Sequence, residues 1–382
     1  MVGADIGSTE VRVVQVEGLD RHGQAIVTRV GQAPVKEGAI VQGQIRNQQL
    51  LSLALTRAAK EAAVPLRGMV VGLSTPDTAV TQLVLPSAVR RSERVGAIRN
   101  LGKDISAAVP LSDAELATCL IDTDLSSEGT QVNTLSVVAA SSAQMDELLA
   151  ICRIAKVTPR AIDLSGAALL RALIRSPLDS VDVSTLVDVG ATKTTVVTRQ
   201  GLYLRSLRTL PEGGLSLTRA LMSAMSSSAT ETAELREQAE RDKRNYHLGV
   251  RPEVKLASGH SYVDDRGTFG IADSLAQTGI EEALNRAGEQ LVENIAAAVD
   301  QDSAAFADRT QGATLCGGSA LMPGLKEMLA SRMGIPVQIG RPWATLARNR
   351  NTEHFFRSGG EPPELMLKLS VAIGLALWED PA

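Results

Sequence analysis

Aromatic residues are scarce in this chain, since Phe, Trp and Tyr together make up 2% of its 382 residues. Basic residues are not in excess either: 39 Lys and Arg are balanced by 43 Asp and Glu, for a formal net charge of -4. Single-stranded nucleic acids bind to aromatic stacking platforms in a positive groove, and double-stranded nucleic acids bind to a basic patch. The composition therefore argues against a nucleic-acid partner.

Side chains that cross-link or hold metals are also few. The three cysteines and four histidines are scattered along the chain, at Cys119, Cys152, Cys316, His22, His247, His260 and His354. An odd number of distant cysteines fits neither a disulfide framework nor paired metal ligands. We expect a reducing compartment and no zinc site.

Long apolar runs are missing as well. The longest, residues 365–378, is interrupted by Lys368 and is shorter than the roughly 20 residues that span a bilayer. The N-terminus begins with a strand-like pattern and lacks the charged and apolar regions of a signal peptide. We therefore expect a cytoplasmic protein that reaches the inner face of a membrane only through a partner.

An internal repeat is the most informative feature that is present. Residues 5–14 and 188–197 align without gaps at an offset of 183 residues, and Asp, Gly, Thr, Val and Val coincide. Each copy has the pattern of a strand, a tight turn and a second strand. Gly7 and Gly190 permit a positive φ in the turn and keep the edge of backbone amides open.

The residues of these turns point to a phosphate ligand. Successive backbone N–H groups in a turn form a concavity that binds anions, and Ser8, Thr9 and Thr192 add hydroxyl donors. The leading Asp5 and Asp188 could hold a hydrated Mg²⁺, which prefers one or two carboxylates together with phosphate oxygens. The repeat therefore predicts two phosphate-binding turns that grip one ligand.

A second, weaker repeat pairs two helical segments rich in small residues, 166–173 and 372–379. Small side chains let two helices approach closely, as a hinge between lobes requires.

At this point the chain resembles the actin-like ATPase superfamily and, within it, the PilM family of type IV pilus assembly, over nearly its whole length. The resemblance implies an α/β, actin-like (ribonuclease H-like) two-lobed ATPase fold with ATP and Mg²⁺ as cofactors. Residues 5–9 and 188–192 resemble the two phosphate loops, and residues 315–324 resemble the adenosine loop. The segments 163–173 and 372–378 resemble the two connecting helices.

Two further motifs complete the implied nucleotide site. Residues 211–218 resemble the family's Gly-Gly…Leu-Thr helix start, whose N–H groups would face phosphate. In residues 239–243, Glu240 and Lys243 share a helix face and would contact ribose and adenine. The implied nucleotide-binding residues are Asp5, Gly7, Ser8, Thr9, Arg12, Asp188, Gly190, Ala191, Thr192, Gly213, Gly214, Glu240, Lys243, Gly317, Gly318 and Ser319.

The expected organisation has four parts. The first lobe comprises residues 1–82, 161–183 and 365–382, and the inserted subdomain comprises residues 83–160. The core of the second lobe comprises residues 184–214 and 300–364, and its upper subdomain, which covers the adenine, comprises residues 215–299. The insertion reads as β-α-β-β-α, with helices at 92–108 and from Ser141, where Ser141 and Gln144 fit a capping box. PilM and the division protein FtsA share such an insertion. FtsA-like chains continue into an amphipathic membrane helix, whereas this sequence ends four residues after Trp378, which favours PilM.

The sequence departs from the superfamily where water would be activated. The superfamily pattern resembles Asp-x-Glu-x-x-Ala, but residues 163–168 read Asp-Leu-Ser-Gly-Ala-Ala, so that Ser165 replaces the acid. Serine is a poor base at neutral pH. Arg12 also replaces a common lysine, with different donor geometry. We assign no catalytic residue, although Asp5 and Asp188 are weak candidates, and we expect slow or absent ATP hydrolysis.

The expected function is a nucleotide-gated assembly platform with at most weak ATPase activity. The resemblance implies a partner, the cytoplasmic N-terminal peptide of a PilN-like inner-membrane protein, in a groove between the first lobe and the insertion. The pilus motor ATPase, the platform protein and further copies of the chain are additional candidate partners. Two alternatives stay open: an FtsA-like filament-forming division or cytoskeletal ATPase, and a small-molecule kinase, for which no sugar-binding loop is found. Secretion and competence machines use similar proteins.

Overall fold

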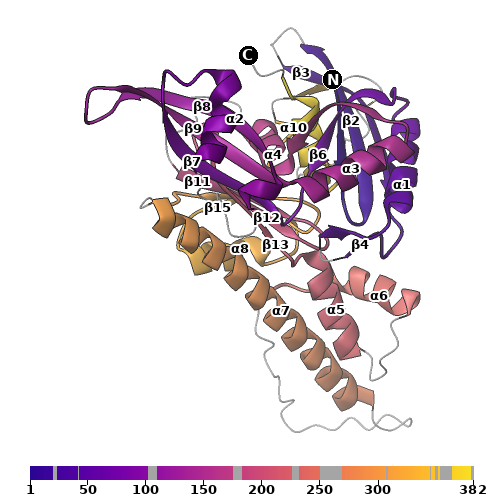
Figure 1. Cartoon of the computed structure of the whole chain (residues 1–382). Helices are drawn as coiled ribbons and strands as arrows, with labels where there is room; N and C mark the ends of the chain where they lie inside the picture. The colour runs from indigo at the N-terminus through magenta and orange to yellow at the C-terminus, as the bar shows by residue number, and fades with distance from the viewer. Residues whose placement is uncertain are drawn as a thin grey trace.

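The computed structural model describes residues 1–19, 24–41, 43–101, 110–174, 183–225, 232–249, 269–306, 309–344, 346–348, 352 and 364–379. Two mixed sheets and a smaller antiparallel sheet form the body. Helices α5 (Gly214–Met225), α6 (Ala233–Lys243) and α7 (Phe269–Phe306) extend from it (Figure 1).

The first sheet has six strands in the order β10-β6-β1-β2-β3-β16. These strands are Thr158–Leu164, Arg67–Leu73, Val2–Ile6, Glu10–Leu19, Ala25–Pro34 and Leu346–Arg348. All five residues of β1 are buried, because β1 is a central strand with helices on both faces. Side chains alternate along β2, so that Val11 and Val13 pack on the side of helix α1 (Gln48–Glu61), whereas Val14 and Val16 pack on the side of α10 (Ser370–Ala376).

The second sheet has five strands in the order β13-β12-β11-β14-β15. They are Tyr203–Leu210, Thr194–Gln200, Val183–Val189, Ala313–Cys316 and Val337–Ile339. Its helices are α5 (Gly214–Met225), α6 (Ala233–Lys243), α7 (Phe269–Phe306) and α8 (Leu325–Met333). Asp302 of α7 is 1% exposed and accepts hydrogen bonds from Thr198, Ser206 and Arg208. This buried carboxylate therefore ties α7 to β12 and β13.

The smaller sheet has the order β7-β9-β8, and β8 and β9 form a long hairpin (Figure 1). The strands are β7 (Thr78–Pro86), β9 (Gln131–Ser141) and β8 (Ala114–Leu125). The connecting segments contain the 3-10 turns η1 (Arg91–Glu93) and η2 (Leu111–Asp113) and the helix α2 (Arg94–Asn100), and helix α3 (Ser142–Ile154) follows β9. A two-stranded ribbon, β4 (Ile40–Val41) and β5 (Gln44–Ile45), lies between β3 and α1 in the chain. The element order β-α-β-β-α matches the one expected for the insertion, although β7 begins before residue 83. The exact division into lobes and insertion stays a prediction.

Of two local expectations in this region, one lies partly outside the described residues and the other is corrected. The helix expected at 92–108 is helical over Arg94–Asn100, and residues 102–109 lie outside the described residues. Ser141 is the N-cap residue of α3 but makes no side-chain capping bond. Gln144 donates instead to Asp77 Oδ2 at 3.2 Å, because the tertiary contact with the turn before β7 offers it a charged acceptor.

The close helix pair that the small residues predicted is present. Helix α4 (Ser165–Leu173) packs against α10, and a Cβ atom at Gly374 would overlap the carbonyl of Ala168. Arg171 Nε also donates to the Gly374 carbonyl at 3.0 Å. However, Asp163 is the penultimate residue of β10, and α4 begins only at Ser165. A short helix, α9 (Glu364–Lys368), precedes α10.

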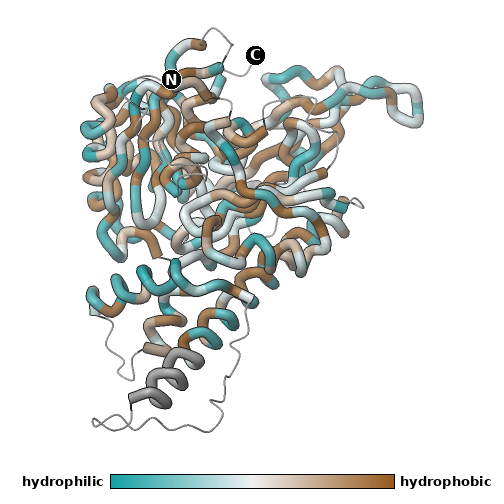
Figure 2. Tube along the Cα trace, turned by 180° about the vertical axis from the view of Figure 1, so that it is seen from behind, coloured by the Kyte–Doolittle hydropathy of each residue, from teal (hydrophilic) through white to brown (hydrophobic). Residues whose placement is uncertain are grey.

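Apolar residues are concentrated along the strands of the body, whereas α6 is mostly hydrophilic (Figure 2). Within the part of the chain that the structure describes, none of the helices combines the length and apolar character that a bilayer crossing requires.

Candidate functional site

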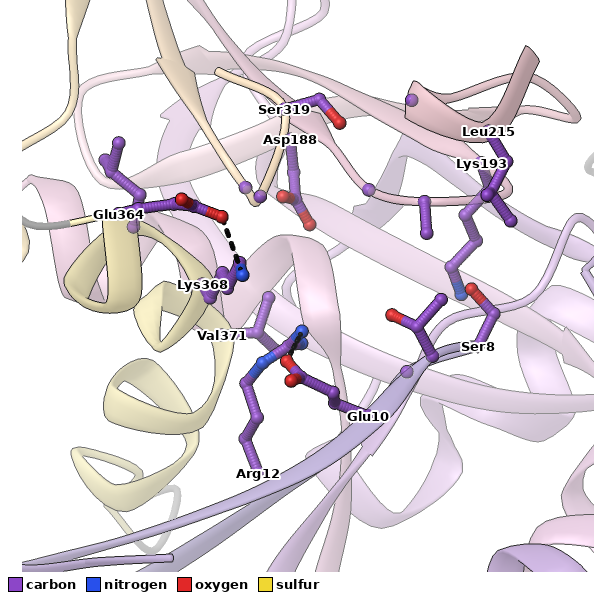
Figure 3. Close-up of a pocket in the computed structure, with 18 of the residues that line it drawn as sticks. Ser8, Glu10, Arg12, Asp188, Lys193, Leu215, Ser319, Glu364, Lys368 and Val371 are labelled. Atoms are coloured by element: carbon purple, nitrogen blue, oxygen red, sulfur yellow. Dashed lines mark hydrogen bonds and ion pairs between the residues drawn. The ribbon is translucent and has the colours of Figure 1, made fainter. Parts of the chain in front are cut away.

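One cavity of about 500 Å³ is lined from both large sheets (Figure 3). Its walls include the β1–β2 turn, the β11–β12 turn, α6, the turn after β14, and α9. Most of the expected nucleotide-binding residues line it: Asp5, Gly7, Ser8, Thr9, Arg12, Asp188, Gly190, Ala191, Gly214, Glu240, Lys243, Gly317, Gly318 and Ser319. Thr192 and Gly213 are not among the lining residues. Tertiary folding thus brings together segments as distant in the sequence as the β1–β2 turn and α9.

The two repeated turns have the same backbone structure. Gly7 N–H donates to the Glu10 carbonyl at 3.0 Å, and Gly190 N–H donates to the Lys193 carbonyl at 3.0 Å. Neither glycine uses the positive φ that a glycine permits. Glycine is required for a different reason, since a Cβ atom would lie 2.7 Å from the Glu10 carbonyl oxygen in the first turn and 2.9 Å from that of Lys193 in the second.

Asp5 and Asp188 occupy equivalent places at the ends of central strands β1 and β11. Burial raises the pKa of Asp5, against the opposing effect of Arg12 and Lys193. Burial and the negative charge of Asp5 raise the pKa of Asp188 to about 6. Two carboxylates whose ionisation is opposed in this way form a favourable site for a cation.

The donor set fits Mg²⁺ only in part. Oxygen ligands are what Mg²⁺ prefers, and Asp5 and Asp188 supply them. Among the described residues, however, there is no cluster of three or more His, Cys, Asp or Glu side chains that could hold a metal. A magnesium ion here would depend on water and on the oxygens of a bound anion for the rest of its coordination.

Arg12 is held by carboxylates of its own strand and of β1. Its guanidinium lies 3.3 Å from Asp5 Oδ2 and 2.9 Å from Glu10 Oε2, and its side chain is 12% exposed. The positive charge of Arg12, which was expected among the nucleotide-binding residues, is therefore already paired within the protein.

Lys193, which the sequence reasoning missed, enters the cavity from the second turn. Its ammonium donates to the backbone carbonyl of Ser74, in the segment between β6 and β7. Burial lowers the pKa of Lys193, while the charges of Asp5 and Asp188 raise it. The repeat contained a usable signal, because Lys193 stands at the position that matches Glu10.

The Gly-Gly helix start is used differently from the expectation. The amides of Gly214 and Leu215, at the start of α5, donate to the carbonyls of Gly190 at 2.9 Å and Ala191 at 2.8 Å. A Cβ atom at Gly213 would lie 2.8 Å from the Ala191 carbonyl oxygen. The first amides of α5 therefore support the second turn and do not face a ligand.

Glu240 and Lys243 form an ion pair of 2.8 Å on α6. The Thr218 hydroxyl donates to Glu240 at 2.5 Å, and Lys243 Nζ donates to Thr218 Oγ1 at 2.8 Å and to the Gly214 carbonyl at 3.1 Å. Burial raises the pKa of Glu240, but the bonds from Lys243 and Thr218 outweigh it and leave that pKa below its usual range. The pair is thus a fixed part of the cavity wall and not a solvated surface pair.

The turn after β14 passes directly beside Asp188. Gly317 has φ +90°, and a Cβ atom there would overlap the Asp188 carboxylate and lie 2.6 Å from the Val189 carbonyl oxygen. Ser319 N–H donates to the same carbonyl at 3.1 Å. Glycine at position 317 is required both by its φ and by this close approach.

Ion pairs from distant segments surround the cavity, and the sequence reasoning did not foresee them. Lys368 and Glu364 of α9 pair at 2.7 Å (Figure 3). Arg244, just after α6, pairs with Glu364 at 3.2 Å, and Arg236 of α6 pairs with Glu37.

Ser165 does line the cavity, as expected for the position that an acid often occupies. It is 3% exposed, and its hydroxyl finds no hydrogen-bond partner within the described chain. Asp163 is not a lining residue and instead pairs with Arg171.

Comparison of the sequence with known protein families identifies the family of this chain. The family model described as type IV pilus assembly protein PilM matches residues 3–254. The chain belongs to the PilM family. A model for the cell division protein FtsA also matches, over residues 185–355, and the cell division protein FtsA of Streptococcus pneumoniae is 24% identical over 92% of this chain and 78% of its own length.

Solved structures show the fold of this PilM family member. The solved structure of a PilM-PilN type IV pilus biogenesis complex has a TM-score of 0.73, at 19% identity over 98% of this chain and 97% of that one. MreB 5 of Spiroplasma citri bound to AMPPNP has a TM-score of 0.50, at 12% identity over 99% and 95% of the two chains. These similarities confirm the actin-like two-lobed fold.

Proposed function

We propose that this PilM family member binds Mg-ATP in the cavity between its two large sheets. The observation that carries the proposal is the pair of matching turns, each led by an aspartate, that line one cavity. Asp5 and Asp188 would hold Mg²⁺ through water, and the hydroxyls of Ser8 and Thr9 would donate to phosphate oxygens. The adenosine would lie toward Glu240, Lys243, Gly317 and Gly318. MreB 5, whose solved structure has AMPPNP bound, has a similar fold.

Titration calorimetry with Mg-ATP tests this proposal. We expect Asp5→Asn to weaken binding strongly, since one of two cation ligands is lost, and Glu17→Gln to leave it unchanged, since Glu17 is exposed on β2. Equal affinity of wild type and Asp5→Asn would place any ATP site elsewhere.

We propose further that hydrolysis is slow or absent, because a serine lines the cavity at position 165. Phosphoryl transfer to water needs a group that orients the nucleophile, and a serine hydroxyl is a poor base near neutral pH. Single-turnover hydrolysis measured beside affinity decides this point. Turnover on the order of 1 per second or faster, as in active kinases, would contradict it.

The proposed role of the bound nucleotide is to bias the arrangement of the two lobes. A short cytoplasmic peptide of a PilN-like inner-membrane protein would read that arrangement from a groove between the first lobe and the insertion, so that the chain works at the inner face of the membrane. The similarity in fold to the PilM-PilN complex supports this choice of partner. We expect a fluorescent peptide of this kind to bind with different affinity in the presence and absence of Mg-ATP. Identical affinity would remove nucleotide gating.

A filament-forming ATPase is the second candidate, because the FtsA model matches residues 185–355. Sedimentation with Mg-ATP separates the two functions: a pelleted polymer favours the filament, and soluble protein that still binds the peptide favours the platform. Copies of the chain and the pilus motor ATPase remain proposed partners that pull-down with purified components would test.

A further inference from the structure

The cations around the cavity differ in how far the protein itself neutralises them. Most have a carboxylate partner within 4.0 Å, namely Arg12, Arg236, Lys243, Arg244 and Lys368. Lys193 differs from them, because none of the described carboxylates lies within 4.0 Å of its ammonium; the charges of Asp5 and Asp188 act on it from a greater distance.

The hydrogen bonds of Lys193 are also incomplete. An ammonium group has three N–H donors, and within the described chain one of them is used, by the carbonyl of Ser74. The Lys193 side chain lines the cavity, and its ammonium, with the remaining donors, points toward Ser8 of the first turn (Figure 3). A buried charge without enough partners is unfavourable, and such a group is suited to an anion that enters from solvent.

The neighbourhood of Lys193 indicates which anion. The ammonium comes from one of the two matching turns and faces the other, so it lies where the proposed Mg²⁺-bound phosphates would be held. Arg12 is less suitable for this task, since Asp5 and Glu10 already bind its guanidinium. Lys193 therefore keeps N–H donors, and a charge without an ion-pair partner within 4.0 Å, for a polyphosphate.

We propose that Lys193 is the side chain that binds the polyphosphate of the nucleotide. The same ammonium holds the Ser74 carbonyl that follows β6 of the first sheet, while Lys193 itself belongs to the β11–β12 turn of the second sheet. Lys193 thus links phosphate occupancy to the contact between the sheets. The inference rests on the proposed function, since it assumes that the cavity takes a nucleotide.

Calorimetry of ATP, ADP and adenosine in the presence of Mg²⁺ tests the assignment. For Lys193→Met we expect the affinity for ATP to fall by about 10- to 100-fold, the range for a lost charge-assisted hydrogen bond, and the affinity for adenosine to change less than about twofold. Lys193→Arg keeps the charge and should recover part of the ATP affinity. Lys326→Met, on the exposed face of α8, serves as the control and should bind like wild type.

Lys243→Met separates a phosphate role from general damage to the cavity. Lys243 supports the α6 wall through Glu240 and Gly214, so its loss should weaken ATP and adenosine by a similar factor. A purely structural role of Lys193 would give the same uniform pattern and would overturn the inference. Melting curves of each variant establish that it is folded, and Lys193→Gln replaces Lys193→Met if the latter is not.

The outcomes distinguish this inference from the proposed function. If wild type binds ATP no more tightly than adenosine, the nucleotide proposal itself is wrong. If wild type prefers ATP and Lys193→Met keeps that preference, only the role of Lys193 is refuted. A second readout follows from the Ser74 contact: ATP should slow hydrogen exchange at the amides of Ser74, Thr75 and Asp77 in wild type and have a smaller effect in Lys193→Gln. Equal slowing in both proteins would refute the link between the sheets.

Discussion

Replacing Asp188 with Asn should stabilise the nucleotide-free protein even though it removes a proposed metal ligand. The pKa of Asp188 is raised from 3.8 to about 6 by burial and by the charge of Asp5, so the folded protein opposes its ionisation. At about 1.36 kcal/mol per pH unit, ionised Asp188 costs about 3 kcal/mol at neutral pH. This value already includes the favourable effects of the Arg12 and Lys193 charges, which lower the pKa of Asp188. Asn has nearly the same shape, so the packing of Gly317 is retained.

The sign of the effect can be followed with pH. A carboxyl group whose pKa is higher in the folded state than in the unfolded state favours folding at low pH, and that contribution is lost as pH rises through the folded pKa. Below a pH of about 4, Asp188 is protonated in both states, and the variant gains nothing. The gain should grow between about pH 4 and pH 6 and be complete above about pH 7.

Urea denaturation of nucleotide-free wild type and Asp188→Asn, followed by circular dichroism at several pH values, measures the difference in unfolding free energy. Asp300→Asn is the matched control, because Asp300 lies on α7 with its side chain 70% exposed. An Asp188→Asn variant that is less stable than wild type at pH 7.5, or equally favoured at pH 4.5 and pH 7.5, would refute a destabilising charge at this position. Calorimetry of the same variant should show strongly weakened Mg-ATP binding.

Two further substitutions test other contacts of the structure. Gly317→Ala should weaken ATP binding at least tenfold and lower the melting temperature, because residue 317 has φ +90° and its Cβ atom would overlap the Asp188 carboxylate. The control Gly201→Ala, at φ +57° with open space around it, should lower the unfolding free energy by only about 1 kcal/mol and leave the calorimetric affinity unchanged. Similar results for both variants would exclude the steric explanation. Asp302→Asn should lower the unfolding free energy measured in urea by roughly 2–3 kcal/mol, since a buried acceptor of three hydrogen bonds loses its charge. A loss below about 0.5 kcal/mol, which is typical of surface positions such as Asp300, would show that these hydrogen bonds do not stabilise the fold.

Much of the fold and part of the site could be predicted from the sequence, because those features are local or repeated. A strand, a glycine turn and a strand leave a periodic pattern, and its recurrence at residues 188–197 predicted that Asp5 and Asp188 play equivalent parts. The structure does place both in one cavity. The small residues of α4 and α10 likewise predicted a close helix pair, since a short side chain is a property of the residue alone.

The tertiary structure alone decided which partner each side chain found. Arg12 has carboxylate neighbours at Asp5 and Glu10, and Lys193 donates to Ser74, which is 119 residues away in the chain. The amides at the start of α5 turned toward the carbonyls of the second turn. A local pattern states which groups can donate, accept or carry charge, but burial and the approach of distant segments determine which of those groups meet and which stay available to a ligand.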